Sequence, residues 1–509
     1  MVPSTLREIA QVVGGTLERV SDPDLVVSGP VVIDSRQVQP GCVFAAFVGE
    51  HVDGHLFAGQ ALAGGAVCVL ASRPVPGPAI MVADTLAAVT ALSGWMARRM
   101  TAVTRIGVTG SSGKTSTKDL LAQVLRGHGC THATVGSQNN ELGVPLTVLA
   151  TPPDVRYLVL EMGARGIGHL AYLTGLVPLD AAIVLNVGAA HAGEFGGPEA
   201  TAQAKGELVE ALPADGIAVL NADDPLVAAM AQRTVASVTW FGYSPRAHVR
   251  AEHVHLDEQG RAGFVLITPS GKAPVRLRLI GEHHVANALA VAALAHAVGQ
   301  DVDATACALS QAMPLSGGRM QRHDLGDGTT VIDDAYNANP DSVAAGLRAL
   351  LAMSAGRPTV AVLGQMAELG DRTEADHRAI GVLAAELGLD LVIAVGGRDA
   401  AAIADAAGDG GVHHRLVADP TAAAALLDEV LPAGAGAGEG LPLGGPAGSR
   451  RTPARAVSSH HPGGDRPAAR QAVQGHLGIT GMSATTMPVV CSGTCAMTSP
   501  RGERTLVGP

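Results

Sequence analysis

The segment Val108–Thr117, which reads VTGSSGKTST, constrains the fold of this chain more than any other stretch. It joins the apolar run Arg105–Thr109 to the helical run Ser116–Arg126. In that context backbone N–H groups and a helix N-terminus can face phosphate, Lys114 can neutralise the terminal phosphates, and the Thr115 hydroxyl can ligate Mg²⁺. The two glycines are closer together than in the general P-loop pattern, so the match is to a shorter variant. The residues that we expect at the nucleotide are Gly110, Ser111, Ser112, Gly113, Lys114, Thr115 and Ser116.

The chain around this turn alternates apolar runs with helical stretches. After a helical stretch near residues 86–100, apolar runs repeatedly end in a polar or glycine-rich turn, and helical patterns separate them. Strands and helices in alternation imply an α/β fold with a parallel sheet that is covered on both faces. The runs of this kind are Arg105–Thr109, Tyr157–Leu160, Ala182–Leu185 and Ile217–Leu220.

Two further α/β units are expected on either side of this central sheet. The first eighty or so residues carry short apolar runs between Gly, Pro and Asp turns, which indicates a small α/β domain. From near Pro314, three more apolar strands alternate with Ala- and Leu-rich helices, as in a Rossmann-like sheet. These strands are Thr329–Ile332, Thr359–Leu363 and Leu391–Val395.

The length of 509 residues allows about three domains. We place an N-terminal domain over residues 1–84, a central ATP-binding P-loop domain over 85–313 and a C-terminal domain over 314–432. Residues 433–509 are rich in Gly, Pro, Arg and Ser without a sustained period, which is typical of a low-complexity tail. Because the periodicity stops abruptly near Ala433, we interpret the tail as the product of a shifted reading frame that leaves the C-terminal domain incomplete.

Composition narrows the class of partner. The chain has 35 basic and 46 acidic residues, a net charge of −11, and only 2% aromatic residues, which argues against a nucleic-acid surface and favours small-molecule partners. We find no apolar run of about 18 or more residues, so we expect no membrane span or signal peptide and a cytoplasmic location. As the oligomeric state we expect a monomer. The six cysteines carry no paired metal-ligand motif, and we expect free thiols.

Candidate metal ligands follow the strands on either side of the glycine-rich turn. Glu161 comes directly after the run YLVL, and His191 comes shortly after the strand that ends at Asn186. In an open parallel sheet the ligand crevice lies beyond the carboxyl ends of the strands, so both residues fall on the rim that carries the phosphate loop. Glu161 offers a hard oxygen that suits Mg²⁺, whereas Mg²⁺ accepts a ring nitrogen less readily. Each residue alone is more often structural, but their shared placement favours a metal site.

Later segments add polar side chains whose role the residues alone leave open. The segment GEHHVANA contributes Asn287, SGGRMQ contributes Arg319, and VIDDAYNANPDS contributes Asp334, Asn337 and Asn339. A run of Asp and Asn after a strand is commonly a turn. An arginine near a nucleotide would stabilise charge on a phosphoryl group in transfer, whereas an exposed arginine in a linker would do nothing chemical.

Together these motifs resemble the Mur ligases, the ATP-dependent enzymes that build the peptide stem of the bacterial cell-wall precursor. The matching segments occur in family order and cover about residues 30–380. Within the family, DAYNANPDS and NNELGVPLT resemble the members that add D-alanyl-D-alanine. The other segments that carry the resemblance are IDSRQVQPGCVFAAFVGEHVDGHLFA, VTGSSGKTSTK, LEMGARGIGHL, LNVGAAHAGEFG, AKGELV, VLNADDP, GEHHVANAL, GGRMQ and VLGQMAELGD.

The resemblance implies a role for each matching position. The N-terminal domain would hold the UDP end of the substrate, the central domain ATP and two Mg²⁺ ions, and the C-terminal domain the incoming dipeptide. It implies substrate binding by Ser35, Arg36, Asp53, His55, Asn139, Asn140, Asn337 and Asn339. It adds Asn287, Arg319 and Asp334 to the ATP site. It implies metal binding by Thr115, Glu161, His191 and Lys205, and catalytic roles for Lys114, Lys205, His191 and Arg319.

Lys205 needs a modification to act as a metal ligand. As an ammonium it has no acceptor for a metal, but an amine can add CO₂ to become a carbamate with two anionic oxygens. The resemblance alone suggests this modification.

The implied reaction has two steps. The terminal carboxylate of UDP-N-acetylmuramoyl-tripeptide attacks the γ-phosphate of ATP to give an acyl phosphate and ADP, and the amine of D-alanyl-D-alanine then displaces phosphate. Lys114 and Mg²⁺ would offset the repulsion between the two anions of the first step. Two alternatives stay open: another ligase of the superfamily, such as a diaminopimelate-adding ligase or a folylpolyglutamate synthase, or a protein that binds ATP or the UDP-linked substrate without turnover because its C-terminus is altered.

Overall fold

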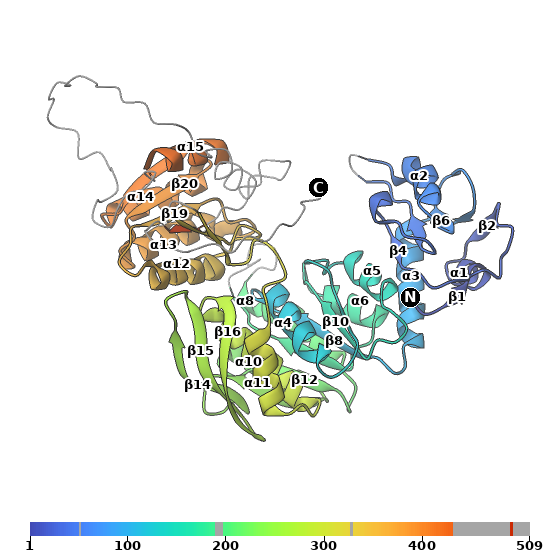
Figure 1. The fold of residues 1–509 in the computed structure, drawn as a ribbon, viewed down its shortest axis with the longest axis horizontal. Coiled ribbons are helices and arrows are strands. Elements are labelled where there is room, and N and C mark those ends of the chain that lie inside the picture. The colour runs from blue at the N-terminus through green and yellow to red at the C-terminus, as the bar shows by residue number, and fades with distance from the viewer. Residues whose placement is uncertain (50–51, 189–196, 326–328, 431–488, 492–509) are drawn as a thin grey trace. The chain divides into compact units, whose positions relative to one another are not determined.

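The computed structural model describes residues 1–49, 52–188, 197–325, 329–430 and 489–491, and it divides into two compact units (Figure 1). The first unit comprises Met1–Asp257, Arg261–Ser316 and Glu368–Gly370. The second comprises Glu258–Gly260, Gly317–Ala367 and Asp371–Pro509. Each unit is described by itself.

The N-terminal part of the first unit holds a five-stranded sheet in the order β2-β7-β6-β5-β4, in which only the β2–β7 pair is antiparallel. Its strands are β2 Thr16–Glu18, β4 Val31–Val32, β5 Val43–Ala45, β6 Cys68–Ala71 and β7 Ala79–Met81. A separate pair is formed by β1 Ser4–Thr5 and β3 Val26–Val27. The helices are α1 Leu6–Val12, η1 Ser35–Gln37, η2 Gly54–Phe57 and α2 Ala58–Ala63.

A nine-stranded sheet forms the centre of the first unit, in the order β16-β15-β14-β13-β12-β11-β8-β10-β9. The strands from β9 to β14 pair in parallel, as the alternating pattern predicts, and β15 and β16 extend the sheet by antiparallel pairing. The sequence pattern did not reveal this antiparallel extension. The strands are β8 Thr104–Thr109, β9 Thr131–Ala133, β10 Tyr157–Glu161, β11 Ala181–Val184, β12 Ile217–Asn221, β13 Ser237–Gly242, β14 Val249–Leu256, β15 Arg261–Thr268 and β16 Gly271–Ile280.

Helices bury apolar side chains against both faces of this sheet. One core contains Leu92, Leu170 and Leu208 from α3, α6 and α8, and the other contains Leu121 and Leu289 from α4 and α10. The helices of the sheet are α3 Thr85–Arg99, α4 Lys114–Arg126, α5 Gly143–Leu149, α6 His169–Leu176, α8 Pro198–Glu210, α9 Pro225–Ala229, η3 Met230–Arg233, α10 His283–Ala297 and α11 Val302–Gln311. Among the described residues, no helix combines the length and the apolar character needed to cross a bilayer.

The second unit is a six-stranded sheet in the order β17-β18-β22-β19-β20-β21 with helices packed on it. β19, β20 and β21 are parallel, which matches the expected Rossmann-like layout. The strands are β17 Gln321–Asp324, β18 Thr330–Asp333, β19 Thr359–Leu363, β20 Leu391–Val395, β21 His413–Val417 and β22 Val489–Cys491. The helices are α12 Pro340–Ser354, η4 Gly370–Arg372, α13 Thr373–Glu386, α14 Arg398–Asp409 and α15 Pro420–Val430.

The tail contributes one strand to this sheet. Val489–Cys491 lies between β18 and β19 and pairs antiparallel with both. The rest of the tail, residues 433–488 and 492–509, lies outside the described residues. The α/β fold class is confirmed, and a short piece of the tail takes part in the sheet.

Candidate active site

The glycine-rich turn has the backbone geometry of a phosphate loop. Gly113 is the N-cap of α4 and has a φ of +79°, a left-handed conformation that favours glycine. A Cβ at Gly113 would come within 2.5 Å of Asn287 Oδ1, so the side chain from α10 lies directly against the loop. The structure therefore brings Asn287 next to the N-terminus of α4, where backbone N–H groups have no partner within the helix.

Asn186, which follows β11, holds this loop in place. Its Oδ1 accepts a hydrogen bond from the Ser112 N–H at 2.9 Å, and its Nδ2 donates to the Ser112 carbonyl at 3.3 Å. The backbone carbonyl of Asn186 accepts from the Ser111 N–H at 3.1 Å. Sequence reasoning did not count Asn186 among the site residues, although its position at the end of a buried strand was a usable signal.

Two lysines lie close to the loop. The Lys114 ammonium donates to the Gly110 carbonyl at 2.7 Å. Lys205, on α8, is 1% exposed, and burial, with a smaller contribution from the Lys114 ammonium, lowers the pKa of Lys205 to about 7. Lys205 thus has a large neutral fraction near neutral pH, which an ordinary lysine lacks.

Glu161 supplies a buried carboxylate at the end of β10. Its strand pairs with β8 so that Glu161 lies opposite Val108, two residues before the loop begins. Oε1 accepts from Asn139 Nδ2 at 2.8 Å, whereas Oε2 is buried and makes no hydrogen bond with any residue in the described part of the chain. An unsatisfied buried carboxylate oxygen suits a hard cation such as Mg²⁺.

The rest of the expected metal site is only partly covered by the structure. His191 lies outside the described residues. Within the described ranges, no group of three or more His, Cys, Asp or Glu side chains gathers at metal-binding spacing. Among the described residues, the predicted partners of Glu161 in metal binding are the Thr115 hydroxyl and a modified Lys205.

The two asparagines of the segment NNEL have different surroundings. Asn139 contacts Glu161, as described above, and its carbonyl accepts from the Gly163 N–H at 2.9 Å. The Oδ1 of Asn140 instead accepts from the N–H groups of Leu142 and Gly143 at 3.3 and 2.9 Å. Asn140 thus stabilises the start of α5 with the side-chain oxygen that we expected to face substrate.

The N-terminal candidates form two local clusters. His55 is 8% exposed; its Nδ1 lies 2.6 Å from Asp53 Oδ1, and its Nε2 accepts from the Ser72 N–H at 3.1 Å. Arg73, which sequence reasoning missed, donates to Asp53 Oδ2 at 2.8 Å. In the other cluster, Arg36 pairs with Asp34 at 2.8 Å, and the Ser35 hydroxyl donates to Gln60 at 3.2 Å. The hydrogen bonds that Asp53 makes with the His55 side chain and accepts from the His55 N–H lower the pKa of the Asp53 carboxyl, and the Arg73 charge adds to this shift.

In the second unit, Arg319 and Asp334 lie together beside Tyr336. The Arg319 guanidinium lies 4.3 Å from the centre of the Tyr336 ring, a cation–π contact. Asp334 Oδ1 accepts from the Met320 N–H at 3.2 Å. Burial raises the pKa of Asp334 to about 7, and the Arg319 charge opposes this shift.

The two asparagines that follow differ in exposure. Asn337 is exposed, as a ligand-binding side chain can be. Asn339 is 6% exposed and caps α12: its Oδ1 accepts from the Ser342 N–H at 2.9 Å, and the Ser342 hydroxyl accepts from the Asn339 N–H at 3.0 Å. This reciprocal cap accounts for Asn339 without a substrate.

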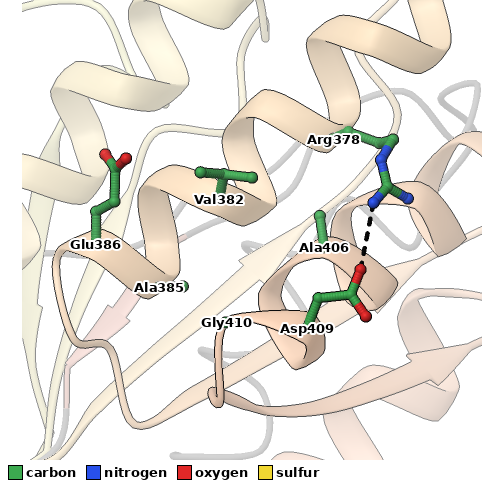
Figure 2. A pocket seen from close by; sticks show the side chains of 7 residues that line it. All are labelled: Arg378, Val382, Ala385, Glu386, Ala406, Asp409 and Gly410. Carbon is green, nitrogen blue, oxygen red and sulfur yellow. Dashed lines mark hydrogen bonds and ion pairs between the residues drawn. The ribbon is translucent and has the colours of Figure 1, made fainter.

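A surface groove of the second unit is lined by none of the predicted site residues. It runs between α13 and α14, and the ion pair between Arg378 and Asp409, at 3.2 Å, crosses it (Figure 2). No residue of its lining is a candidate catalytic group, and the predicted site residues do not line it. The lining residues are Arg378, Val382, Ala385, Glu386, Ala406, Asp409 and Gly410.

Comparison with known families matches three parts of the chain. The Mur ligase family, catalytic domain matches residues 30–91, the Mur ligase middle domain matches residues 108–295, and the Mur ligase, glutamate ligase domain matches residues 318–435. The last match ends close to the point where the periodicity of the sequence stops.

Individual relatives are similar over most of their length. The chain is 46% identical over 426 residues to UDP-N-acetylmuramoyl-tripeptide--D-alanyl-D-alanine ligase of Mycobacterium tuberculosis strain H37Rv, over 78% of this chain and 84% of the relative. The crystal structure of MurF from Acinetobacter baumannii has a TM-score of 0.73 at 33% identity and covers 84% of this chain and 92% of its own. The structure of MurF from Thermotoga maritima in complex with ADP has a TM-score of 0.67 at 28% identity, over 80% of this chain and 92% of its own.

Proposed function

The chain belongs to the Mur ligase family, and from that premise we propose that it joins D-alanyl-D-alanine to UDP-N-acetylmuramoyl-tripeptide with ATP as the energy source, in peptidoglycan precursor synthesis. The observation that carries the proposal is the convergence of the phosphate loop and the buried Glu161 at the ends of the adjacent strands β8 and β10. Such an arrangement suits transfer of a phosphoryl group onto an anion, which is the first requirement of carboxylate activation.

The residues of the first unit would orient the reacting phosphate. The N–H groups of the loop, held by Asn186, would face the phosphates, and the Lys114 ammonium would leave the Gly110 carbonyl for the terminal phosphates. Asn287 lies against Gly113 and is placed to contact the base or ribose of the nucleotide. The substrate carboxylate attacks the γ-phosphate to give an acyl phosphate and ADP. The dipeptide amine then attacks the acyl carbon, loses a proton and expels phosphate.

Mg²⁺ fits the donor set of this site. Thr115, Glu161, His191 and the carbamate form of Lys205 would hold it, and bound Mg²⁺ would offset the charge repulsion between the carboxylate and the γ-phosphate. The unsatisfied Oε2 of Glu161 supports this assignment.

Carbamylation of Lys205 is supported by its surroundings. The pKa of about 7 leaves an unprotonated amine near neutral pH, and that amine can add CO₂ with release of one proton to form an N-carboxy anion. In ¹³C-bicarbonate, NMR of the wild-type protein should show one carbamate carbonyl signal that is absent in Lys205→Arg. The exposed Lys272→Arg variant is the control and should keep the signal. A signal that persists in Lys205→Arg would refute this assignment.

The remaining positions form the outer parts of the proposed site. Arg319, with Asp334 and Tyr336 beside it, would bind the nucleotide from the second unit, and the exposed Asn337 would contact the dipeptide. Ser35, Arg36, Asp53 and His55 would hold the UDP end of the substrate, and Asn139 would contact the muramoyl peptide. Asn140, whose Oδ1 accepts hydrogen bonds from N–H groups at the start of α5, would also contact the muramoyl peptide, and Asn339, which caps α12, would face the dipeptide.

One assay tests the proposed function. Purified full-length chain is mixed with ATP, Mg²⁺ and UDP-N-acetylmuramoyl-tripeptide, and phosphate release is measured with and without D-alanyl-D-alanine. Dipeptide-dependent release, with the amide product identified by mass spectrometry, is the expected result. Release only with a different amine would assign another superfamily activity, and nucleotide binding without release would indicate a chain that its altered C-terminus has inactivated.

A further inference from the structure

Lys118 is a buried charge that the proposed chemistry does not use. It lies on α4, one turn after Lys114, and its side chain is 2% exposed. Its ammonium lies 2.7 Å from the Thr134 carbonyl, 3.1 Å from the Gly136 carbonyl and 2.6 Å from Asp119 Oδ1. An ammonium has three N–H donors, and here each has an acceptor. Because a buried charge is costly without such partners, this arrangement fixes the segments that supply them.

The two carbonyls belong to the segment that leads to the substrate side of the site. Thr134 and Gly136 follow β9 and precede Asn139. The Thr134 hydroxyl accepts from the Glu161 N–H at 3.1 Å, and Asn139 Nδ2 donates to Glu161 Oε1 at 2.8 Å. Lys118 therefore ties the helix of the phosphate loop to the segment that contacts the buried carboxylate.

Asp119 extends the same connection toward the end of the first unit. Its Oδ2 accepts from the Ser316 hydroxyl at 2.6 Å. Ser316 is the last residue before the chain enters the second unit at Gly317. One turn further along α4, Gln123 exchanges two hydrogen bonds of 2.9 Å with the backbone of Met313. Residues 313–316 are thus fixed to the face of α4 that also carries the Lys118–Asp119 pair.

We propose that Lys118 and Asp119 are positioning residues, which hold the segment of Asn139 and the exit segment 313–316 in register with the phosphate loop. The proposal rests on the proposed function, because it deepens the account of that site. Neither residue would contact the phosphates of the nucleotide. Both would act through α4, because the N-terminus of this helix is the proposed phosphate-binding element. A displacement of this helix would move the nucleotide, the Asn139–Glu161 contact and the exit segment together.

Lys118→Met tests the connection to the substrate side. It removes the ammonium and keeps the apolar stem. We expect faster backbone hydrogen exchange at residues 137–143 and an increase of about tenfold in the KM for UDP-N-acetylmuramoyl-tripeptide, with a change of less than about threefold in the Kd for ADP. The matched control is Lys272→Met on the exposed face of β16, which should change none of the three.

A different pattern would overturn the proposal. If exchange and the substrate KM stay at wild-type values, Lys118 does not position this segment. If ADP affinity falls as much as substrate affinity, Lys118 merely supports the fold of α4. If Lys118→Met fails to fold, Asp119→Asn replaces it, because this variant removes the counter-charge of Lys118 while keeping an acceptor for Ser316. The expected result is again a higher substrate KM and faster exchange at residues 137–143, with little change in the Kd for ADP.

Ser316→Ala tests the connection to the exit segment. It removes one hydrogen bond, and we expect kcat to fall by roughly threefold to tenfold with the ADP Kd unchanged. Ser316→Thr keeps the hydroxyl and should restore the rate. Equal rates for the two variants would overturn this arm of the proposal.

Failure of the proposed function can be told apart from failure of the positioning pair. Hydrogen exchange and ADP binding need no turnover. If the wild-type chain releases no phosphate with D-alanyl-D-alanine, the proposed function fails, while loss of protection at residues 137–143 in Lys118→Met still supports the pair.

Discussion

The strand that carries the phosphate loop and the strand that precedes Asp334 are supported in different ways. In the first unit, β8 lies between the parallel strands β10 and β11. Asn186, after β11, hydrogen-bonds to the loop after β8, and Asn139, in the segment after β9, hydrogen-bonds to Glu161 at the end of β10. In the second unit, β18 pairs with β17 on one side and with the three-residue β22 on the other. β22 also provides the pairing to β19.

The phosphate loop after β8 is therefore supported by strands that are near in sequence, whereas the residues after β18 depend on a strand that is distant in sequence. The neighbours of β8 come from residues close to it in the alternating strand–helix pattern. The neighbour of β18 comes from Val489–Cys491, beyond a stretch of 58 residues, 431–488, that lies outside the described part of the chain. Changes in the first unit should therefore alter chemistry more than stability, and changes near β22 should alter the stability of the second unit.

Lys114→Met should have the largest effect and tests the first half of this comparison. The variant loses the charge that faces the phosphates, and we expect kcat/KM to fall about a thousandfold, which corresponds to about 4 kcal/mol of transition-state stabilisation. The melting temperature should stay within about 2 °C of wild type, because Lys114 is only partly buried and its ammonium donates to the loop carbonyls of Gly110 and Ser111. Phosphate release and calorimetry measure the two effects. A large loss of stability would show that the loop depends on Lys114 for its fold.

Val490→Pro tests the second half. Proline removes one backbone donor from the strand that joins β18 to β19, and we expect the free energy of unfolding of the second unit to fall by roughly 3 kcal/mol. Val490→Thr keeps the donor and is the matched control. Hydrogen exchange at β18 and β19 reports the change locally. If Val490→Pro leaves exchange at both strands unchanged, β22 contributes nothing to this sheet.

Much of the candidate site follows from strand ends, which sequence can locate. Glu161 and Lys114 were predicted because they follow an apolar run or open a helix, whereas Asn139 was predicted from the family resemblance. Asn186 and Lys118 were missed, since their roles depend on contacts with residues distant in sequence, and spacing does not reveal which side chains meet. The hydrogen bonds that Asn140 Oδ1 accepts at the start of α5 also became visible only in three dimensions, and they leave its predicted contact with substrate as a prediction.

The fold shows the same division. The parallel strands of the central sheet follow from alternating apolar and helical segments. β15 and β16 were not predicted, because antiparallel strands need no helix between them and so do not show the alternation of strands and helices on which the prediction relied. β22 could not be predicted, because a short apolar run in a tail without periodicity gives no indication of its pairing partners.

Asp334→Asn tests how the second unit holds its buried carboxyl group. Because burial raises the pKa of Asp334 to about 7 from an ordinary value of 3.8, the fold favours the protonated acid. Wild-type stability should therefore decline as pH rises from about 4 to about 7 and level off above it, where both states are ionised. A full shift of this size corresponds to about 4 kcal/mol in the free energy of unfolding. We expect roughly 2 kcal/mol, because the Asp334 side chain, although largely surrounded by protein, keeps intermediate exposure to solvent.

Asp334→Asn keeps the size of the side chain but removes the carboxyl group that gains and loses a proton. Asp334→Asn should be as stable as wild type near pH 4 and more stable at pH 8, measured by chemical denaturation across that range. Asp324→Asn is the control, since interactions with Arg322 and Thr330 lower the pKa of Asp324 and its removal should have the opposite pH dependence. Parallel stability curves for wild type and Asp334→Asn would contradict the expected burial of the acid.

Arg378→Ala should have the smallest effect, and it asks whether the groove between α13 and α14 belongs to the site at all (Figure 2). The side chains of Arg378 and Asp409 are 47% and 73% exposed, so their ion pair should contribute about 0.5 kcal/mol or less to stability. Ligase turnover should be unchanged, because no candidate catalytic or substrate-binding residue lines this groove. Asp409→Ala should match Arg378→Ala in both measurements. If either variant lowered turnover several-fold at unchanged stability, the groove would be a functional part of the second unit, in addition to Arg319 and Asp334. The two units would then differ in the number of functional sites that each one carries.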